Sequence, residues 1–232
     1  MEILPGIVAK DLCVVVGDTI IFSDVHIGLE EALNKQGILI PRFQFNELVV
    51  RIKKILDDAH PFRVVIAGDL KHEFGTISKQ EWRHTLQFLD LLQLYAHEIV
   101  LIRGNHDTIL GPLAEKKGLM IVDHYDLHGV SIFHGNSLPK NINGDVIIIG
   151  HEHPAITLRD GPRSELVKCF LVGQYKKKKI IVLPSFNLVT EGSDVIQEKR
   201  LGPFLSGNLG DFMVYVVSDQ IYKFGKLKRL MT

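Results

Sequence analysis

The sequence has little cysteine and no long hydrophobic run. Only Cys13 and Cys169 occur among its 232 residues, which is too few for a disulfide framework, and they are not spaced as a thiolate pair that holds a metal. Both lie in apolar runs, so we expect two buried structural thiols in a reducing compartment. No apolar run approaches the roughly 18 residues of a membrane helix, and no signal-peptide pattern is present. We therefore predict a cytoplasmic protein that does not enter a membrane.

An excess of charge of one sign is also lacking. Lysine and arginine number 27, aspartate and glutamate number 27, and the formal net charge is zero. Such a chain is not obviously built to coat nucleic acid or an anionic membrane. A lysine run at residues 176–179 and a basic C-terminus are each open to two interpretations, a nucleic-acid contact or a solvated turn. The basic C-terminal residues are Lys223, Lys226, Lys228 and Arg229.

Short runs rich in valine and isoleucine predict many strands, several without alternation and so buried on both faces. They lie at residues 12–16, 19–22, 63–67, 99–102, 130–133, 146–149, 166–172, 180–183, 212–217 and 220–224.

Helices are predicted in the first half of the chain only. Residues 47–59 carry one apolar face, and a second helix begins at Ser78, which stands at capping-box spacing from Glu81. A shorter helix is expected over residues 29–35. The order of elements predicts an α/β fold of layered α+β type, with two packed mixed sheets flanked by helices. We expect a single domain over residues 1–232, with a β-rich C-terminal part from about residue 155.

The chain is rich in histidine, with 11 residues of this type, and polar motifs follow several predicted strands directly. The ends of neighbouring strands meet at one edge of a sheet, where ligands collect, and glycines beside the polar residues permit tight turns. The motifs are Ser23-Asp24-Val25-His26, Gly68-Asp69-Leu70-Lys71-His72, Gly104-Asn105-His106-Asp107, His134-Gly135-Asn136 and Gly150-His151-Glu152-His153.

The motifs supply carboxylate oxygen, amide oxygen and imidazole nitrogen, but no thiolate. One structural zinc ion needs only four ligands, whereas two divalent ions that share a carboxylate use a larger set and keep open positions for water and substrate. A lone D-x-H is weak support. GNHD at a strand end is stronger, because His106 and Asp107 in a tight loop have no core role. GHEH is stronger again, because alternate histidines on an extended segment point to the same side. The potential ligands are Asp24, His26, Asp69, Asn105, His134, His151 and His153.

In this order the motifs resemble the calcineurin-like metallophosphoesterase superfamily, whose pattern is DxH, GD, GNH[DE], H and GHxH. The resemblance spans residues 24–153. The block Gly68-Asp69-Leu70-Lys71-His72 looks like that of double-strand-break repair nucleases. The later Leu183-Pro184-Ser185-Phe186-Asn187 is similar to a segment of the small ligase-associated DNA-repair phosphoesterases.

The resemblance implies a four-layer sandwich, two metal ions and a site for each. It assigns Asp24, His26, Asp69 and His153 to the first ion, and Asp69, Asn105, His134 and His151 to the second, so that Asp69 bridges. His106 is then the substrate-facing catalytic histidine and Asp107 its orienting partner. Manganese is the first expectation for both ions, and iron and zinc also accept this ligand set.

The implied activity is hydrolysis of phosphodiester bonds by in-line attack of a hydroxide that bridges the two metal ions, with DNA or RNA as a candidate substrate. The alternatives are a small-molecule phosphomonoesterase or cyclic-nucleotide phosphodiesterase, and a non-catalytic scaffold with the same fold. His72 either lines the substrate cleft or supports the site through a hydrogen bond, and Arg103 pairs either with substrate phosphate or with a carboxylate. A homo-oligomer and a DNA-repair partner protein are further expectations.

Overall fold

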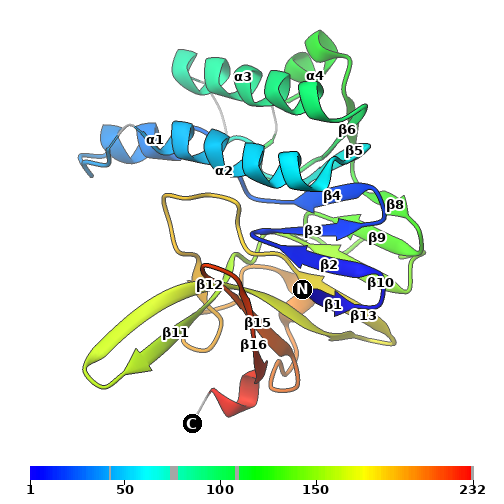
Figure 1. The fold of residues 1–232 in the computed structure, drawn as a ribbon, viewed down its shortest axis with the longest axis vertical. Coiled ribbons are helices and arrows are strands. Elements are labelled where there is room, and N and C mark those ends of the chain that lie inside the picture. Colours follow the sequence, from blue (N-terminus) through cyan, green and yellow to red (C-terminus); the bar gives the residue numbers. More distant parts are fainter. Residues whose placement is uncertain (42, 74–77, 108–109, 231–232) are drawn as a thin grey trace.

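The computed structural model describes residues 1–41, 43–73, 78–107 and 110–230. In this part of the chain two mixed β-sheets pack against each other (Figure 1). The strands of the first sheet stand in chain order: β1 (Glu2–Leu4), β2 (Ile7–Lys10), β3 (Cys13–Val16), β4 (Thr19–Phe22), β5 (Arg63–Ala67), β6 (Glu98–Ile102) and β7 (Met120–Val122).

The first sheet changes from antiparallel to parallel pairing at β4. Strands β4 to β7 are parallel, and their register sets Phe22 beside Ile66 and Ile66 beside Leu101. The carboxyl ends of β4, β5 and β6 therefore lie side by side. The three motifs that follow these strands leave the sheet at the same edge.

The second sheet carries the rest of the chain and repeats this arrangement. Its strands β9 and β10 are parallel, with Ile149 beside Phe133, so the residues that follow them are neighbours as well. The sheet is ordered β14-β11-β12-β13-β10-β9-β8, with β15 paired to β12 and β16 to β15. The bounds are β8 (Tyr125–Leu127), β9 (Val130–Phe133), β10 (Val146–Ile149), β11 (Pro154–Asp160), β12 (Arg163–Tyr175), β13 (Lys178–Val182), β14 (Ser193–Asp194), β15 (Met213–Val217) and β16 (Ile221–Lys226).

The helices gather on one side of the molecule, over the first sheet (Figure 1). Ser78 caps the third of them as predicted, since its Oγ accepts a hydrogen bond of 3.0 Å from the Glu81 N–H. The outer face of the second sheet is covered by a segment that packs Phe204, Leu205 and Phe212 against it. The helices are α1 (Leu29–Lys35), α2 (Gln44–Ala59), α3 (Lys79–Tyr95) and α4 (Gly111–Lys117), with 3₁₀ turns η1 (Pro203–Leu205) and η2 (Leu227–Arg229).

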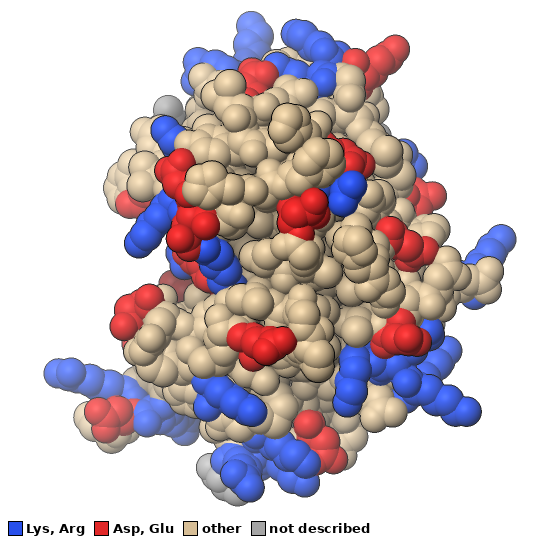
Figure 2. Space-filling view, turned by 45° about the vertical axis from the view of Figure 1, so that its right-hand side comes forward, with Lys and Arg blue, Asp and Glu red and all other residues tan. Residues whose placement is uncertain are grey.

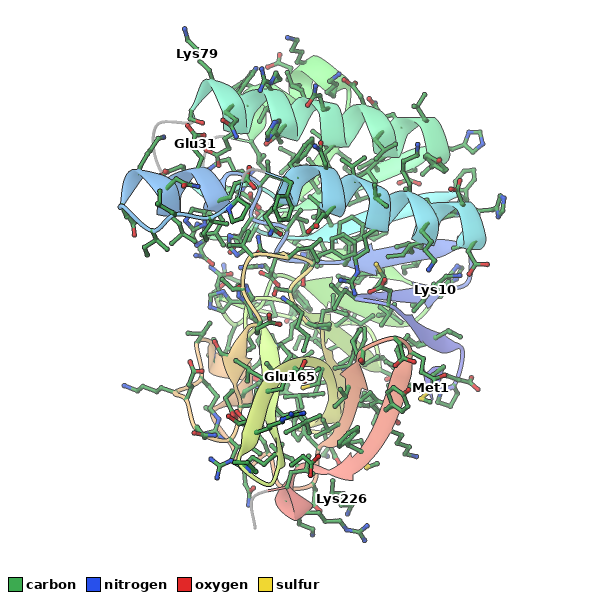
Figure 3. All side chains as sticks on the ribbon, turned by 60° about the vertical axis from the view of Figure 1, so that its left-hand side comes forward. Met1, Lys10, Glu31, Lys79, Glu165 and Lys226 are labelled. Atoms are coloured by element: carbon green, nitrogen blue, oxygen red, sulfur yellow. The ribbon has the colours of Figure 1, made fainter. Side chains whose placement is uncertain are left out.

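The predicted mixed sheets and flanking helices are thus confirmed, and so are the two buried cysteines, which are free thiols. Lys79 at the start of α3 and Lys226 at the end of β16 mark opposite ends of the molecule (Figure 3). Among the described helices, none has the length and apolarity that crossing a membrane requires. The candidate metal ligands lie between these ends, where the two sheets meet.

Candidate metal centre

The strand ends that carry the polar motifs are joined by main-chain hydrogen bonds. The Asp24 N–H donates to the Gly68 carbonyl at 3.0 Å, and the His26 N–H donates to the Asp69 carbonyl at 3.0 Å. A parallel bridge pairs Ser23 with Ser185 and so links β4 to the loop after β13. These bonds fix the first two motifs relative to each other.

Many of the candidate ligands have a strained backbone. The φ angles of Asp24, His26, Asp69, His151 and His153 are 57°, 47°, 52°, 67° and 46°, in the left-handed region that residues with a Cβ rarely adopt. Such conformations persist only where the surroundings impose them, and they cluster at functional sites. The strain supports a common function for these five residues.

One group of donor atoms is formed by Asp24, His26 and His153. His153 Nε2 lies 3.1 Å from Asp24 Oδ1 and 3.4 Å from His26 Nε2. Asp69 Oδ2 lies 3.8 Å from His26 Nε2. Two atoms that bind one ion at about 2.1 Å are separated by about 3.0–3.5 Å. The spacing of this group therefore fits a single cation.

A second group surrounds His134. Its Nε2 lies 3.3 Å from Asp69 Oδ2, 3.0 Å from Asn105 Oδ1 and 3.2 Å from His151 Nδ1. Its other nitrogen, Nδ1, is 3.0 Å from the Ala67 carbonyl oxygen, which can only accept, so the hydrogen resides on Nδ1. Nε2, the nitrogen that faces Asp69, is then the one that can offer a lone pair to a cation, as ligating histidines do. Asp69 Oδ2 is close to ligands of both groups.

The electrostatics of the centre also fit cations. Asp24 is fully buried, and its Oδ1 has no hydrogen-bond donor among the described residues. Burial opposes the charged form of Asp24, yet the neighbouring His153 holds the pKa of this carboxyl well below its usual range. Burial likewise opposes the charged form of His134, but its bond to Asp69 raises the pKa of His134 to about 9. The buried carboxylates thus draw positive charge to the place where the ligands converge.

His72 and His106 lie beside the first group. Their rings are stacked, with centroids 5.3 Å apart, and His72 Nδ1 is 3.4 Å from His26 Nδ1. His106 Nδ1 donates to the His72 carbonyl, and His106 Nε2 is directed at Asp69 Oδ2, 3.9 Å away. The structure therefore brings both predicted histidines to the centre, and His72 contacts a candidate ligand directly.

Asp107 differs from the prediction. We expected its carboxylate to orient the His106 ring, but it accepts hydrogen bonds from the N–H groups of Asp69 at 2.7 Å, Gly104 at 3.0 Å and Leu70 at 3.2 Å. Burial and repulsion from Asp69 raise the pKa of Asp107 to about 6. Asp107 therefore holds the loops after β5 and β6 together, and the His72 carbonyl orients His106 in its place.

Two buried charged residues support the centre in ways that the sequence did not reveal. Lys71 is fully buried and its ammonium contacts the carbonyl of His106. Glu81, also fully buried, accepts hydrogen bonds from the N–H groups of His72 at 2.9 Å and Glu73 at 3.0 Å. The capping-box spacing identified Glu81 only as a helix residue, and its second role depends on the approach of a distant loop.

The remaining predicted residues lie outside the two groups. Arg103 pairs with Asp123 at 3.5 Å, which agrees with the interpretation that it meets a carboxylate. The lysine run forms the turn between β12 and β13, and Lys178 donates to the Gly144 carbonyl at 2.6 Å. At the C-terminus, Lys226 and Lys228 both pair with Asp211. On the face shown in Figure 2, the coloured basic side chains are scattered among acidic ones rather than joined in one surface.

Comparison with known proteins identifies the family of the chain and a similar fold. The family model of calcineurin-like phosphoesterases matches residues 17–152. No curated protein sequence matches the chain. Among solved structures, the nuclease MPE of Pseudomonas putida is similar with a TM-score of 0.68 at 18% identity, over 92% of each chain. The phosphoesterase Yfce of E. coli gives a TM-score of 0.39 at 16% identity, over 90% of this chain and 97% of that chain.

Proposed function

Because this chain belongs to the calcineurin-like phosphoesterase family, we propose that it is a dinuclear metal-dependent phosphodiesterase that cleaves nucleic acid. The observation that carries the proposal is the position of Asp69. Its Oδ2 lies 3.3 Å from His134 Nε2 and 3.8 Å from His26 Nε2. One carboxylate oxygen thus stands between two groups of ligands, as a bridge between two ions requires.

The residues present fit such a pair of ions. Asp24, His26, Asp69 and His153 would hold one, and Asp69, Asn105, His134 and His151 the other. Two divalent cations held there supply Lewis acidity toward phosphate oxygens and lower the pKa of water. An oxygen and nitrogen ligand set without thiolate accepts manganese, iron or zinc, and manganese is our first choice.

The chain's own residues bind and orient the phosphate ester and move a proton. Polar contacts with described residues hold His106 in place: its N–H donates to Asp69 Oδ1 at 2.9 Å, its Nδ1 donates to the His72 carbonyl, and Lys71 contacts its carbonyl. Because Nδ1 is engaged, Nε2 is the atom that faces the ligand groups. We assign to Nε2, in the imidazolium form that carries a hydrogen on both ring nitrogens, a hydrogen bond to the phosphate oxygen and transfer of its proton to the leaving oxygen, which leaves a neutral imidazole with its hydrogen on Nδ1.

The proposal of a diester, and of nucleic acid, draws support from two sources. The structural neighbour with a TM-score of 0.68 is the nuclease MPE. At 18% identity this likeness supports the fold directly and the substrate by analogy. The block that ends in His72 resembles that of repair nucleases. A phosphomonoesterase remains the competing activity, and the assay is chosen to separate the two.

The test compares hydrolysis of bis-p-nitrophenyl phosphate, p-nitrophenyl phosphate and a single-stranded oligonucleotide with added manganese. We expect turnover of the diester and the oligonucleotide, abolished by a chelator. Activity on the monoester alone would overturn the diester assignment. No manganese-dependent activity on any of the three would overturn the proposed function as a whole.

A further inference from the structure

A second cavity opens beside the metal centre, between the loops that follow β6, β7 and β9. This side cleft is lined by residues 103–104, 123–124, 133–137, 139–141 and 143, and its volume is about 690 Å³. Pockets that bind small organic ligands measure about 300–1,000 Å³. The candidate ligand His134 also lines the cleft. A substrate whose phosphate is held at the metal centre therefore reaches into the cleft with the next group attached to that phosphate.

The side cleft carries more positive charge than the chain as a whole. Arg103 and Lys140 line it together with one carboxylate, Asp123. Arg103 pairs with Asp123 at 3.5 Å, but a guanidinium has five donors, so this pair leaves others for a phosphate. No carboxylate of the described ranges lies within ion-pair distance of the exposed Lys140. The cleft thus has one uncompensated cation in a chain whose net charge is zero.

An aromatic ring stands at the same cleft. The ring of His124 stacks on Phe133, with centroids 5.5 Å apart and planes 19° from parallel. Half of the His124 side-chain surface is exposed, at 50%, whereas Phe133 is buried and backs the ring from beneath. A supported, accessible ring beside a cation is the combination by which proteins hold unpaired bases on a charged backbone.

Two side-chain amides complete the lining. Asn136 and Asn141 are exposed, and within the described part of the chain neither is a donor or acceptor in a side-chain hydrogen bond. Each amide offers both donors and an acceptor, which suits the edges of a base or the hydroxyl of a sugar. A cation, a ring and amides at one cavity favour a nucleotide over a simple anion or a lipid.

We propose that the side cleft binds the nucleotide next to the scissile phosphate of a single-stranded nucleic acid. This inference rests on the proposed function and adds a subsite to it. Lys140 meets the flanking phosphate, and His124 stacks on the flanking base. The base must be unpaired, since stacking on a side chain requires an open face.

The test measures binding separately from turnover. Fluorescence anisotropy of a labelled oligothymidylate, with a chelator present, gives affinity as a function of salt for the wild type, Lys140→Ala, His124→Ala and His124→Phe. Lys53→Ala is the matched control, because Lys53 is exposed on α2 and does not line the cleft. Turnover of bis-p-nitrophenyl phosphate with manganese is measured for the same proteins.

We expect His124→Ala to weaken oligonucleotide binding roughly tenfold, on the scale of one lost base contact, and His124→Phe to restore it. Lys140→Ala should reduce the slope of log K against log[salt] by about 0.7, the value of one single-strand phosphate. Bis-p-nitrophenyl phosphate turnover should be unchanged, since that substrate has neither a flanking phosphate for Lys140 nor a nucleoside base for His124.

Two outcomes would overturn the subsite: affinities of both alanine variants equal to that of Lys53→Ala, or no oligonucleotide binding by a wild-type protein that cleaves bis-p-nitrophenyl phosphate. In the first case the proposed function stands. In the second case the phosphodiesterase activity stands, but nucleic acid is refuted as its substrate. Conversely, absence of manganese-dependent cleavage together with the expected binding pattern would refute the proposed function and leave the subsite.

Discussion

Gly104→Ala should disrupt the metal centre without changing any ligand. A Cβ atom at this position would lie 2.1 Å from Asp69 Oδ1 and 2.4 Å from the Asp69 main-chain nitrogen. Carbon in van der Waals contact needs about 3.5 Å, so the carboxylate or its loop must move by more than about 1 Å. Metal sites tolerate displacements of about 0.2 Å. The substitution therefore misplaces the one carboxylate that lies between both ligand groups.

The expected result is a loss of bound metal and of activity in a folded protein. A misplacement of about 1 Å costs roughly 10²-fold in turnover. Metal content is measured by inductively coupled plasma mass spectrometry, turnover with bis-p-nitrophenyl phosphate, and folding by circular dichroism. Gly111→Ala is the control, because a Cβ there meets nothing within 4 Å. Wild-type metal content and turnover in Gly104→Ala would refute the bridging position of Asp69.

Three further substitutions test other parts of the site. His106→Ala should retain the metal and lower kcat by about 10²-fold; undiminished kcat would remove His106 from catalysis. Glu81→Ala should lower the free energy of unfolding by about 2 kcal/mol, because it leaves the N–H group of Glu73 unpaired and removes one of the two acceptors of the His72 N–H, which also donates to the Ile27 carbonyl at 3.0 Å. Urea denaturation checks this. Burial lowers the pKa of Lys168 to about 8, so the unfolded chain binds more protons between about pH 8 and 10.5. The free energy of unfolding of the wild type should therefore rise with pH in this range by up to about 3 kcal/mol relative to that of Lys168→Met. Urea denaturation at pH 7 and 10 measures it, and an equal change in both proteins would contradict this prediction.

Local sequence patterns predicted the strands that surround the centre. The strands β4, β5, β9 and β10 have the predicted bounds, because each is a mostly apolar run that ends abruptly in a polar motif. Six strands were missed, since they are short or carry exposed positions that break the pattern: β1, β2, β7, β8, β11 and β14. Helix α4 was missed because it is only seven residues long and begins with glycine and proline.

The candidate ligands were predictable, because parallel strands bring their carboxyl ends to one edge of a sheet. The residues that hold the ligand loops in place could not be predicted. Asp107 bonds to the N–H groups of Asp69 and Leu70, which are 38 and 37 residues away in the sequence. Lys168 is buried beside Ser185, whose Oγ accepts from it at 2.6 Å, although lysine is ordinarily a surface residue. Such contacts arise from the packing of distant loops, and no local pattern encodes them.

The most direct test of the centre is the number of metal ions that the folded chain binds. After loading with manganese and removal of excess, we expect two ions per chain by mass spectrometry and an exchange-coupled signal by electron paramagnetic resonance. Asp69→Asn should lose the coupling and at least one ion. One ion per chain in the wild type, or two coupled ions in Asp69→Asn, would contradict a dinuclear centre bridged by Asp69.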